Sequence, residues 1–153
     1  MVYLIGVDHI IQHGGYMSPE KECAITDFQH YLREQVQFLG ATLLAEEFSA
    51  GALELNGVSV STVGQVAQKI GLRHLLCDPG RAERKSFGIS TNAEREAYWL
   101  QQLRPFKEDE IIFVCGDDHI STFSKVLNSA NWSCRVLSTG WGKTLNPMRR
   151  ENV

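Results

Sequence analysis

Short runs rich in apolar residues alternate along the chain with longer stretches that have helical periodicity. The short runs cover residues 2–7, 42–45, 72–77, 111–115 and 133–137. Residues 2–7 and 111–115 are unbroken apolar runs, which are typical of strands whose two faces are both covered. In the intervening stretches, apolar residues recur every three or four positions, which places them on one face of a helix. The pattern therefore predicts five strands separated by helical segments.

Helices are predicted over residues 18–40, 63–71, 91–103 and 123–130. The first begins at Ser18-Pro19, where serine caps the helix and proline suits the first helical position. The third begins at residues 91–94, whose Thr-x-x-Glu spacing is that of a capping box. Residues 49–58 and 80–90 contain glycine but no apolar stripe, so an irregular connection and an exposed loop are predicted there.

The alternation of strands and helices predicts one α/β domain. We expect a single-domain sandwich in which a mainly parallel sheet of about five strands carries helices on both faces. A chain of 153 residues fits one domain. The domain is predicted to span residues 1–138, and residues 139–153 to form a loosely ordered C-terminal tail because they show no periodicity.

The composition limits the binding partners and the cellular compartment that we expect for this protein. Fifteen Lys and Arg against 18 Asp and Glu give a net charge of −3, which argues against a nucleic-acid partner. No apolar stretch approaches the roughly 18 residues of a membrane span, so no membrane partner is expected. The four cysteines form no Cys-x-x-Cys pair, which favours the reducing cytoplasm. The oligomeric state is left open, a homodimer included.

Polar residues stand directly after four of the predicted strands. They are Asp8 and His9, Glu46 and Glu47, Asp78, and finally Asp117, Asp118 and His119. Ligands of open α/β sheets bind outside the carboxyl ends of the strands, so these residues are candidates for a site. His9 and His119 both follow a strand in a Gly-x-x-His frame, whereas His13, His30 and His74 are expected to be structural.

Two kinds of chemistry fit this set. His9, His119 and a carboxylate, with Glu47 or Glu46 as the source, could bind a divalent metal such as Mn, Co or Zn, which would lower the pKa of bound water. Alternatively, one histidine acts as general base and a carboxylate orients it, without a metal. Successive strand residues point to opposite faces, so only one of the two glutamates can face the site.

The remaining candidates concern the substrate. Arg84 lies in the segment after Asp78 and could hold an anionic group bidentately. Asp8, Asp78 and Asp118 are assigned to substrate binding and to the support of the two histidines. Cys77 and Cys115 adjoin the same edge, so a thiol nucleophile is a further alternative.

The order of these motifs resembles the TraB/Tiki/erythromycin-esterase-like superfamily of α/β proteins. The similar segments are Gly6-x-x-His9, residues 43–47, residues 75–78 with Arg84, residues 94–96, residues 113–119 and residues 131–137. The resemblance implies that the Gly-x-x-His histidines and the strand-end glutamate form the active or metal-binding centre, here His9, Glu47 and His119. It further implies metal-dependent proteolysis, as in the Tiki branch, or histidine-driven ester hydrolysis, as in the erythromycin-esterase branch.

We therefore expect a small cytoplasmic hydrolase that acts on an ester, peptide or phosphoester-like bond of a small-molecule or peptide substrate. The alternative is a non-catalytic module that binds a small anion or a nucleotide-like ligand in the same cleft. A third interpretation is an interaction protein or an inactive relative, whose polar edge contacts another chain.

Overall fold

A five-stranded parallel sheet forms the centre of the protein. The computed structural model describes residues 1–14 and 17–145. The strands are β1 (Val2–Val7), β2 (Leu43–Glu46), β3 (Arg73–Leu76), β4 (Ile111–Gly116) and β5 (Cys134–Trp141). Their order in the sheet is β3-β2-β4-β1-β5, and every neighbouring pair is parallel. The predicted α/β sandwich with a parallel sheet is confirmed.

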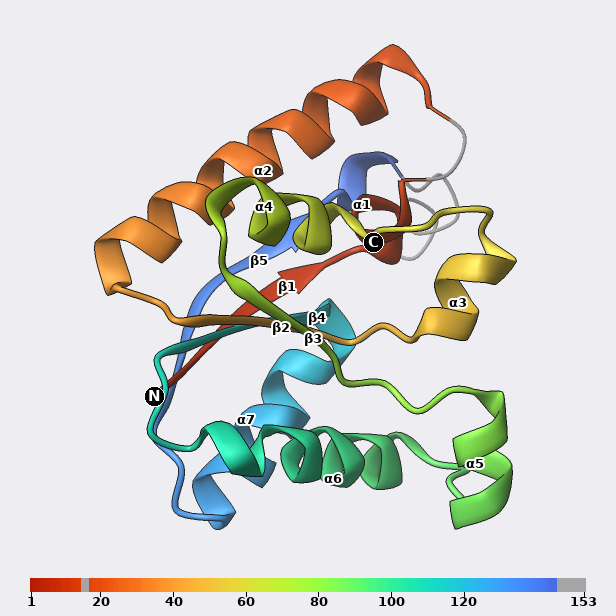
Figure 1. Cartoon of the computed structure of the whole chain (residues 1–153), viewed down its shortest axis with the longest axis vertical. Helices are drawn as coiled ribbons and strands as arrows, with labels where there is room; N and C mark the ends of the chain where they lie inside the picture. The colour runs from red at the N-terminus through yellow and green to blue at the C-terminus, as the bar shows by residue number, and fades with distance from the viewer. Residues whose placement is uncertain (15–16, 146–153) are drawn as a thin grey trace.

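Helices cover both faces of this sheet. They are α1 (His9–His13), α2 (Pro19–Leu39), α3 (Ala50–Leu55), α4 (Thr62–Ile70), α5 (Arg81–Phe87), α6 (Asn92–Leu103) and α7 (Ile120–Ser129). Short 3₁₀ turns occupy Arg104–Phe106, Asp117–His119 and Lys143–Leu145. In Figure 1, α2 and α4 lie on one face, α6 and α7 lie on the other, and α3 and α5 lie beyond the end of the sheet. Helices α2 and α4, which precede β3 in the sequence, therefore cover a different face from α6 and α7, which follow it.

The alternation of side chains along the strands divides the core into two layers. Ile5 and Val7 of β1 pack with residues of α2 and α4, whereas Leu4 packs with residues of α6 and α7. On the second face, the indole of Trp99 contacts the rings of Phe113 and Phe123. Because both faces of β1 and β4 are covered, their sequences are apolar at every position, as the pattern indicated.

The helix ends follow their capping residues. Ser18 Oγ accepts a hydrogen bond from Lys21 N at 3.2 Å, and α2 ends where Gly40 adopts a φ of 64°. Thr91 and Glu94 form the predicted capping box at the start of α6. The backbone N–H groups of Ser90 and Thr91 donate to the Glu94 carboxylate and lower its pKa to about 2.

Three short helices were not predicted. Helix α1 begins directly after β1, and α3 lies within residues 49–58, where an irregular connection was expected. Helix α5 lies within residues 80–90, where a loop was expected, and none of its residues is buried. A helix without a buried face has no apolar stripe, so hydrophobic periodicity could not reveal it.

Strand β5 is longer than predicted and changes the expected end of the domain. It continues past residue 137 to Trp141, so the boundary predicted at residue 138 lies inside a strand. The Trp141 ring lies 5.4 Å from that of Phe28 and 5.0 Å from that of Tyr31. These ring contacts hold the end of β5 against α2. Residues 146–153 of the predicted tail lie outside the described residues.

The carboxyl ends of the three central strands meet at one edge of the sheet, called here the carboxyl edge. Val7 of β1 is level with Gly116 of β4, and Glu46 of β2 is level with Val114. The residues that follow these strands therefore emerge side by side. In the part of the chain that the structure describes, none of the helices combines the length and apolar character that a membrane crossing needs.

Candidate functional site

An open pocket of about 780 Å³ lies at the carboxyl edge. Its charged and histidine side chains are Asp8, His9, His13, Glu47, Asp78, Arg95, Asp118 and His119. The 3₁₀ turn after β4 supplies His119, and the start of α1 supplies His9. Segments more than a hundred positions apart in the sequence thus contribute to one cavity.

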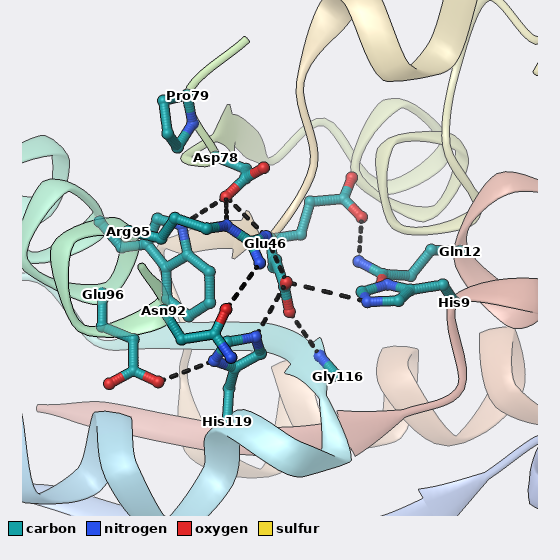
Figure 2. Close-up of polar contacts among 12 residues, drawn as sticks. His9, Gln12, Glu46, Asp78, Pro79, Asn92, Arg95, Glu96, Gly116 and His119 are labelled. Carbon is teal, nitrogen blue, oxygen red and sulfur yellow. Dashed lines mark hydrogen bonds and ion pairs between the residues drawn. The ribbon is translucent and has the colours of Figure 1, made fainter. Parts of the chain in front are cut away.

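Glu47 lies at the centre of this pocket. Its side chain is 1% exposed, and its Oε2 accepts a hydrogen bond from Gly116 N at 2.7 Å. Its Oε1 lies 3.4 Å from His119 Nε2 and 3.8 Å from His9 Nε2. Figure 2 shows His9 and His119 directed toward one another from different elements, and the dashed lines from their rings mark the contacts of the two Nε2 atoms with Glu47 Oε1. Both rings therefore face the same oxygen atom.

Glu46 points to the opposite face of the sheet. Leu44, two residues before it, packs in the layer of α2 and α4, whereas Ala45 packs with α6 and α7. Strand alternation therefore turns Glu46 toward α4 and Glu47 toward α6. Glu46 is fully buried and is absent from the pocket lining. Of the two glutamates left open by the sequence, Glu47 lines the pocket and Glu46 does not.

His119 is held by a buried carboxylate. Its Nδ1 lies 2.7 Å from Glu96 Oε1, which also accepts a hydrogen bond from Thr122 Oγ1 at 2.5 Å. A carboxylate only accepts hydrogen bonds, so Nδ1 carries the hydrogen of a neutral His119 and Nε2 presents its lone pair to the pocket. The edge of Trp99 against the ring, at a centroid distance of 4.9 Å, fixes the plane of the imidazole.

His9 is held by an amide instead. It is the first residue of α1, whose N-cap Asp8 accepts a hydrogen bond from Ile10 N at 3.1 Å. One turn further along, Gln12 Oε1 lies 2.7 Å from His9 Nδ1. The His9 side chain is 50% exposed, so its ring is open to solvent as well as to Glu47.

Arg95 connects two carboxylates across the pocket. Its Nη2 donates to Glu47 Oε1 at 2.6 Å, and its Nε donates to Asp78 Oδ1 at 2.9 Å. Burial opposes the charge of the guanidinium, but Asp78 and Glu47 outweigh this effect and raise the pKa of Arg95. Arg95 is therefore a fixed positive charge whose donors are directed at the protein itself.

Arg84 does not line the pocket, contrary to its predicted contact with an anionic substrate group. Its Nη2 lies 2.7 Å from Asp78 Oδ2, and its Nε donates to Pro79 O at 3.0 Å. As part of α5, the residue folds back on the turn that follows β3. Arg95 is the arginine that lines the pocket.

The three aspartates predicted for substrate binding all line the pocket. Asp8 caps α1, and Asp78 is engaged by Arg84, Arg95 and Trp99 Nε1. Asp118 is exposed at the rim. Together with Glu47 they give the lining four carboxylates against the one guanidinium of Arg95. The electrostatic character of the wall is therefore acidic.

The positive charge of Arg95 opposes a divalent metal ion at Glu47. Each oxygen of Glu47 already accepts a hydrogen bond, Oε2 from Gly116 N and Oε1 from Arg95. A metal ion on Oε1 would lie beside the positive charge of Arg95, and like charges at that distance repel. Among residues 1–14 and 17–145, no group of three His, Cys, Asp or Glu side chains has the geometry to hold a metal ion.

The two cysteines near the carboxyl edge are buried beneath the pocket and do not line it. Burial, with the charge of Glu46 nearby, raises the pKa of the Cys77 thiol. Burial, with the charge of Glu47 nearby, raises the pKa of Cys115. Because the thiolate is the nucleophilic form, both side chains are poor nucleophiles in this environment.

Four contributors to the site carried no role in the sequence-based prediction, namely Gln12, Asn92, Arg95 and Glu96. Arg95 and Glu96 stand next to each other in a helix whose apolar face is Trp99 and Leu103. Helical spacing places Glu96 on the same face as Trp99, since the two are three positions apart. A charged residue on a buried helix face was the available signal that Glu96 has a partner inside the protein.

Comparisons of the chain with protein-family models, with curated proteins and with solved structures found no match.

Proposed function

We propose that this protein is a hydrolase of the TraB/Tiki/erythromycin-esterase-like type that cleaves an ester bond with histidine and carboxylate groups. The observation that supports it most is the placement of both imidazole Nε2 atoms against Glu47 Oε1, at 3.4 Å and 3.8 Å, in an open pocket. The Nδ1 atoms of both rings are occupied by Glu96 and Gln12. Both Nε2 atoms are therefore available to take up a proton.

The nucleophile in this proposal is a water molecule between the two rings. Such a water donates one hydrogen to His119 Nε2 and the other to His9 Nε2, which leaves its oxygen lone pairs directed at the substrate. A general base must lie within hydrogen-bond reach of the proton that it removes. His119 takes this role because Glu96 holds its Nδ1–H and stabilises the imidazolium that forms.

The proton and bond changes balance within the pocket. The water oxygen forms a bond to the carbonyl carbon of the ester while its proton moves to His119 Nε2. The tetrahedral intermediate then collapses, the bond from carbon to the alcohol oxygen breaks, and His119 returns the proton to that oxygen. Glu47 and Arg95 remain charged throughout, and their ion pair fixes the pocket wall against which both rings are held.

Asn92 is the donor that we assign to the oxyanion of this intermediate. Its Oδ1 accepts from Arg95 Nη1 at 3.4 Å, which leaves its Nδ2 hydrogens for the pocket that it lines. A neutral donor suits this position because Arg95 is already engaged by Glu47 and Asp78. Removal of one oxyanion donor commonly costs about 10²–10³ in kcat.

The charge of the lining favours a neutral or cationic substrate. Four carboxylates and one paired guanidinium oppose the binding of a phosphoester or of a nucleotide-like anion. The same argument weakens the alternative of a non-catalytic anion-binding module. We therefore place carboxylic esters first and peptides second among the expected substrates.

We also propose the reducing cytoplasm as the compartment. The four cysteines, all within the described part of the chain, are free thiols. Such thiols persist where disulfides are kept reduced.

Hydrolysis of p-nitrophenyl acetate and p-nitrophenyl butyrate by the purified protein tests the proposal. His119→Ala is expected to lower kcat by about 10²–10⁴-fold, whereas His30→Ala, at an exposed position on α2, leaves it unchanged. Dialysis against EDTA is expected to leave the rate unchanged, and elemental analysis separates this chemistry from metal-dependent hydrolysis. No hydrolysis by the wild type above that of the His119→Ala variant, or a rate that EDTA abolishes, contradicts the proposal.

A further inference from the structure

We propose that Glu46, on the far face of the sheet, sets the tautomer of His9 through Gln12 and is thus a positioning residue for the pocket. The consequence for the reaction rests on the proposed hydrolysis, but the hydrogen-bond chain itself does not. In this hydrogen-bond chain, Gln12 Nε2 donates to Glu46 Oε2, and Gln12 Oε1 contacts His9 Nδ1.

Glu46 is a buried carboxylate surrounded by donors. It is fully buried, and its Oε1 accepts from Ser61 Oγ and lies 2.8 Å from His74 Nε2. Its Oε2 accepts from Gln12 Nε2 at 3.0 Å. A carboxylate has lone pairs and no hydrogen, so it can bind the amide of Gln12 only through the NH₂ group.

The orientation of the Gln12 amide then decides which nitrogen of His9 carries the hydrogen. Gln12 is fully buried, so its amide has no solvent to satisfy it in another orientation. With its NH₂ group directed at Glu46, its carbonyl oxygen faces His9 Nδ1 at 2.7 Å. A carbonyl oxygen only accepts, so Nδ1 must donate, and the lone pair of Nε2 is directed at the pocket.

The hydrogen bonds from Glu46 through Gln12 to His9 explain why two consecutive glutamates stand at the end of β2. Glu47 faces the two imidazoles directly, whereas Glu46 reaches one of them from behind, across the sheet edge. His119 needs no such relay because Glu96 contacts its Nδ1 without an intermediate. Both rings thereby present the same atom, Nε2, to the same oxygen of Glu47.

A purely structural role for Glu46 is the competing explanation. Its bonds to Ser61 and His74 connect the start of α4 with β3, and these bonds alone could account for a buried carboxylate. The two explanations differ in one observable. A structural role predicts that loss of the network lowers stability without selecting a tautomer at His9.

Imidazole ¹⁵N NMR of the full chain at pH 8, where imidazoles are ordinarily neutral, reports the tautomer directly. We expect wild-type His9 to be the Nδ1–H form. Gln12→Met, which keeps the length of the side chain but has no amide, is expected to shift His9 to a mixture with the Nε2–H form. Glu46→Gln is expected to give an intermediate shift, because a neutral amide no longer imposes one orientation on Gln12.

Ser61→Ala is the matched control, since it removes a different donor from the same carboxylate and leaves Gln12 in place. It is expected to lower the melting temperature without a change at His9. The signal of the exposed His30 is the internal reference in every sample. A wild-type His9 in the Nε2–H form, an unchanged tautomer in Gln12→Met or in Glu46→Gln, or an equal shift in Ser61→Ala overturns the proposal.

The activity assay keeps this inference separate from the proposed function. If the wild type hydrolyses p-nitrophenyl acetate, Gln12→Met is expected to lower kcat about twofold or more with little change in KM, because the fraction of His9 in the Nε2–H form can no longer accept a hydrogen from water. An unchanged kcat in an active enzyme overturns the positioning role. If the wild type hydrolyses no ester while the NMR shifts occur as expected, hydrolysis fails and the control of the tautomer stands.

Discussion

Arg95→Met tests the electrostatic centre of the pocket. The substitution keeps an unbranched side chain but removes the guanidinium between Glu47 and Asp78, which are 1% and 9% exposed. It deletes three close contacts, namely Nη2 with Glu47 Oε1 at 2.6 Å, and Nε and Nη2 with Asp78 Oδ1, each at 2.9 Å. The buried carboxylate of Glu47 and the nearly buried one of Asp78 therefore lose their shared positive charge.

The size of the effect follows from what each carboxylate retains. Removal of one partner from a buried ion pair costs about 3–5 kcal/mol. Asp78 keeps Arg84 and Trp99 Nε1 as partners, and Glu47 keeps the N–H of Gly116. We therefore expect the lower end, about 3 kcal/mol. For a domain of this size, each kcal/mol lowers the melting temperature by roughly 2–4 °C, so a decrease of roughly 6–12 °C is expected.

Arg84→Met is the matched control because Arg84 binds the same Asp78 carboxylate from a side chain that is 40% exposed. An exposed pair contributes about 1 kcal/mol or less. Urea unfolding followed by circular dichroism gives the free energy of unfolding of both variants. A loss in Arg95→Met no larger than that in Arg84→Met would refute the view that Arg95 is the charge that holds the pocket together.

Three further variants test other parts of the account. Glu96→Gln is expected to lower kcat for p-nitrophenyl acetate by about 10³-fold, because an amide can turn its NH₂ group toward Nδ1 and then no longer selects the Nδ1–H form of His119; an unaffected kcat refutes this. Gly116→Ala is expected to lower kcat about 10-fold, since its Cβ would meet His9 Nε2 at 3.1 Å and Glu47 Oε2 at 3.3 Å. Gly51→Ala, with nothing within 4 Å, is its control. Glu94, whose pKa is lowered from 4.5 to about 2, stabilises the fold above pH 4.5, and this contribution is lost as the pH falls through about 2. Glu94→Gln should therefore lose less stability than the wild type over that range in acid titrations, and an equal loss would count against the capping box.

The fold could be predicted where burial leaves a periodic pattern. The apolar runs of β1 and β4 are buried at every position, so both were visible in the sequence. Helices α2 and α6 carry capping residues and a buried stripe. Helix α5 has no buried residue, and so its sequence resembles that of a loop. The strand order depends on contacts between distant segments, which no local pattern encodes.

The site was predictable in part for the same reason. His9, Glu47 and His119 follow buried strands, and parallel strands bring their carboxyl ends to one edge. The choice between Glu46 and Glu47 required knowledge of which helices cover each face of β2. Arg95 and Glu96 come from a helix, and their distance from the strand ends depends on how α6 packs beneath the sheet. Gln12 could be found only once the amide partners of Glu46 and His9 were known.

A double-mutant cycle on kcat/KM tests most directly whether His9 and His119 act on one substrate. The measurement compares His9→Ala, His119→Ala and the double variant on p-nitrophenyl acetate. Groups that act as one unit give strongly non-additive losses. The account predicts that the double variant is no slower than the slower single variant within about twofold. Losses that multiply, or wild-type activity in either single variant, would contradict a shared catalytic centre at Glu47.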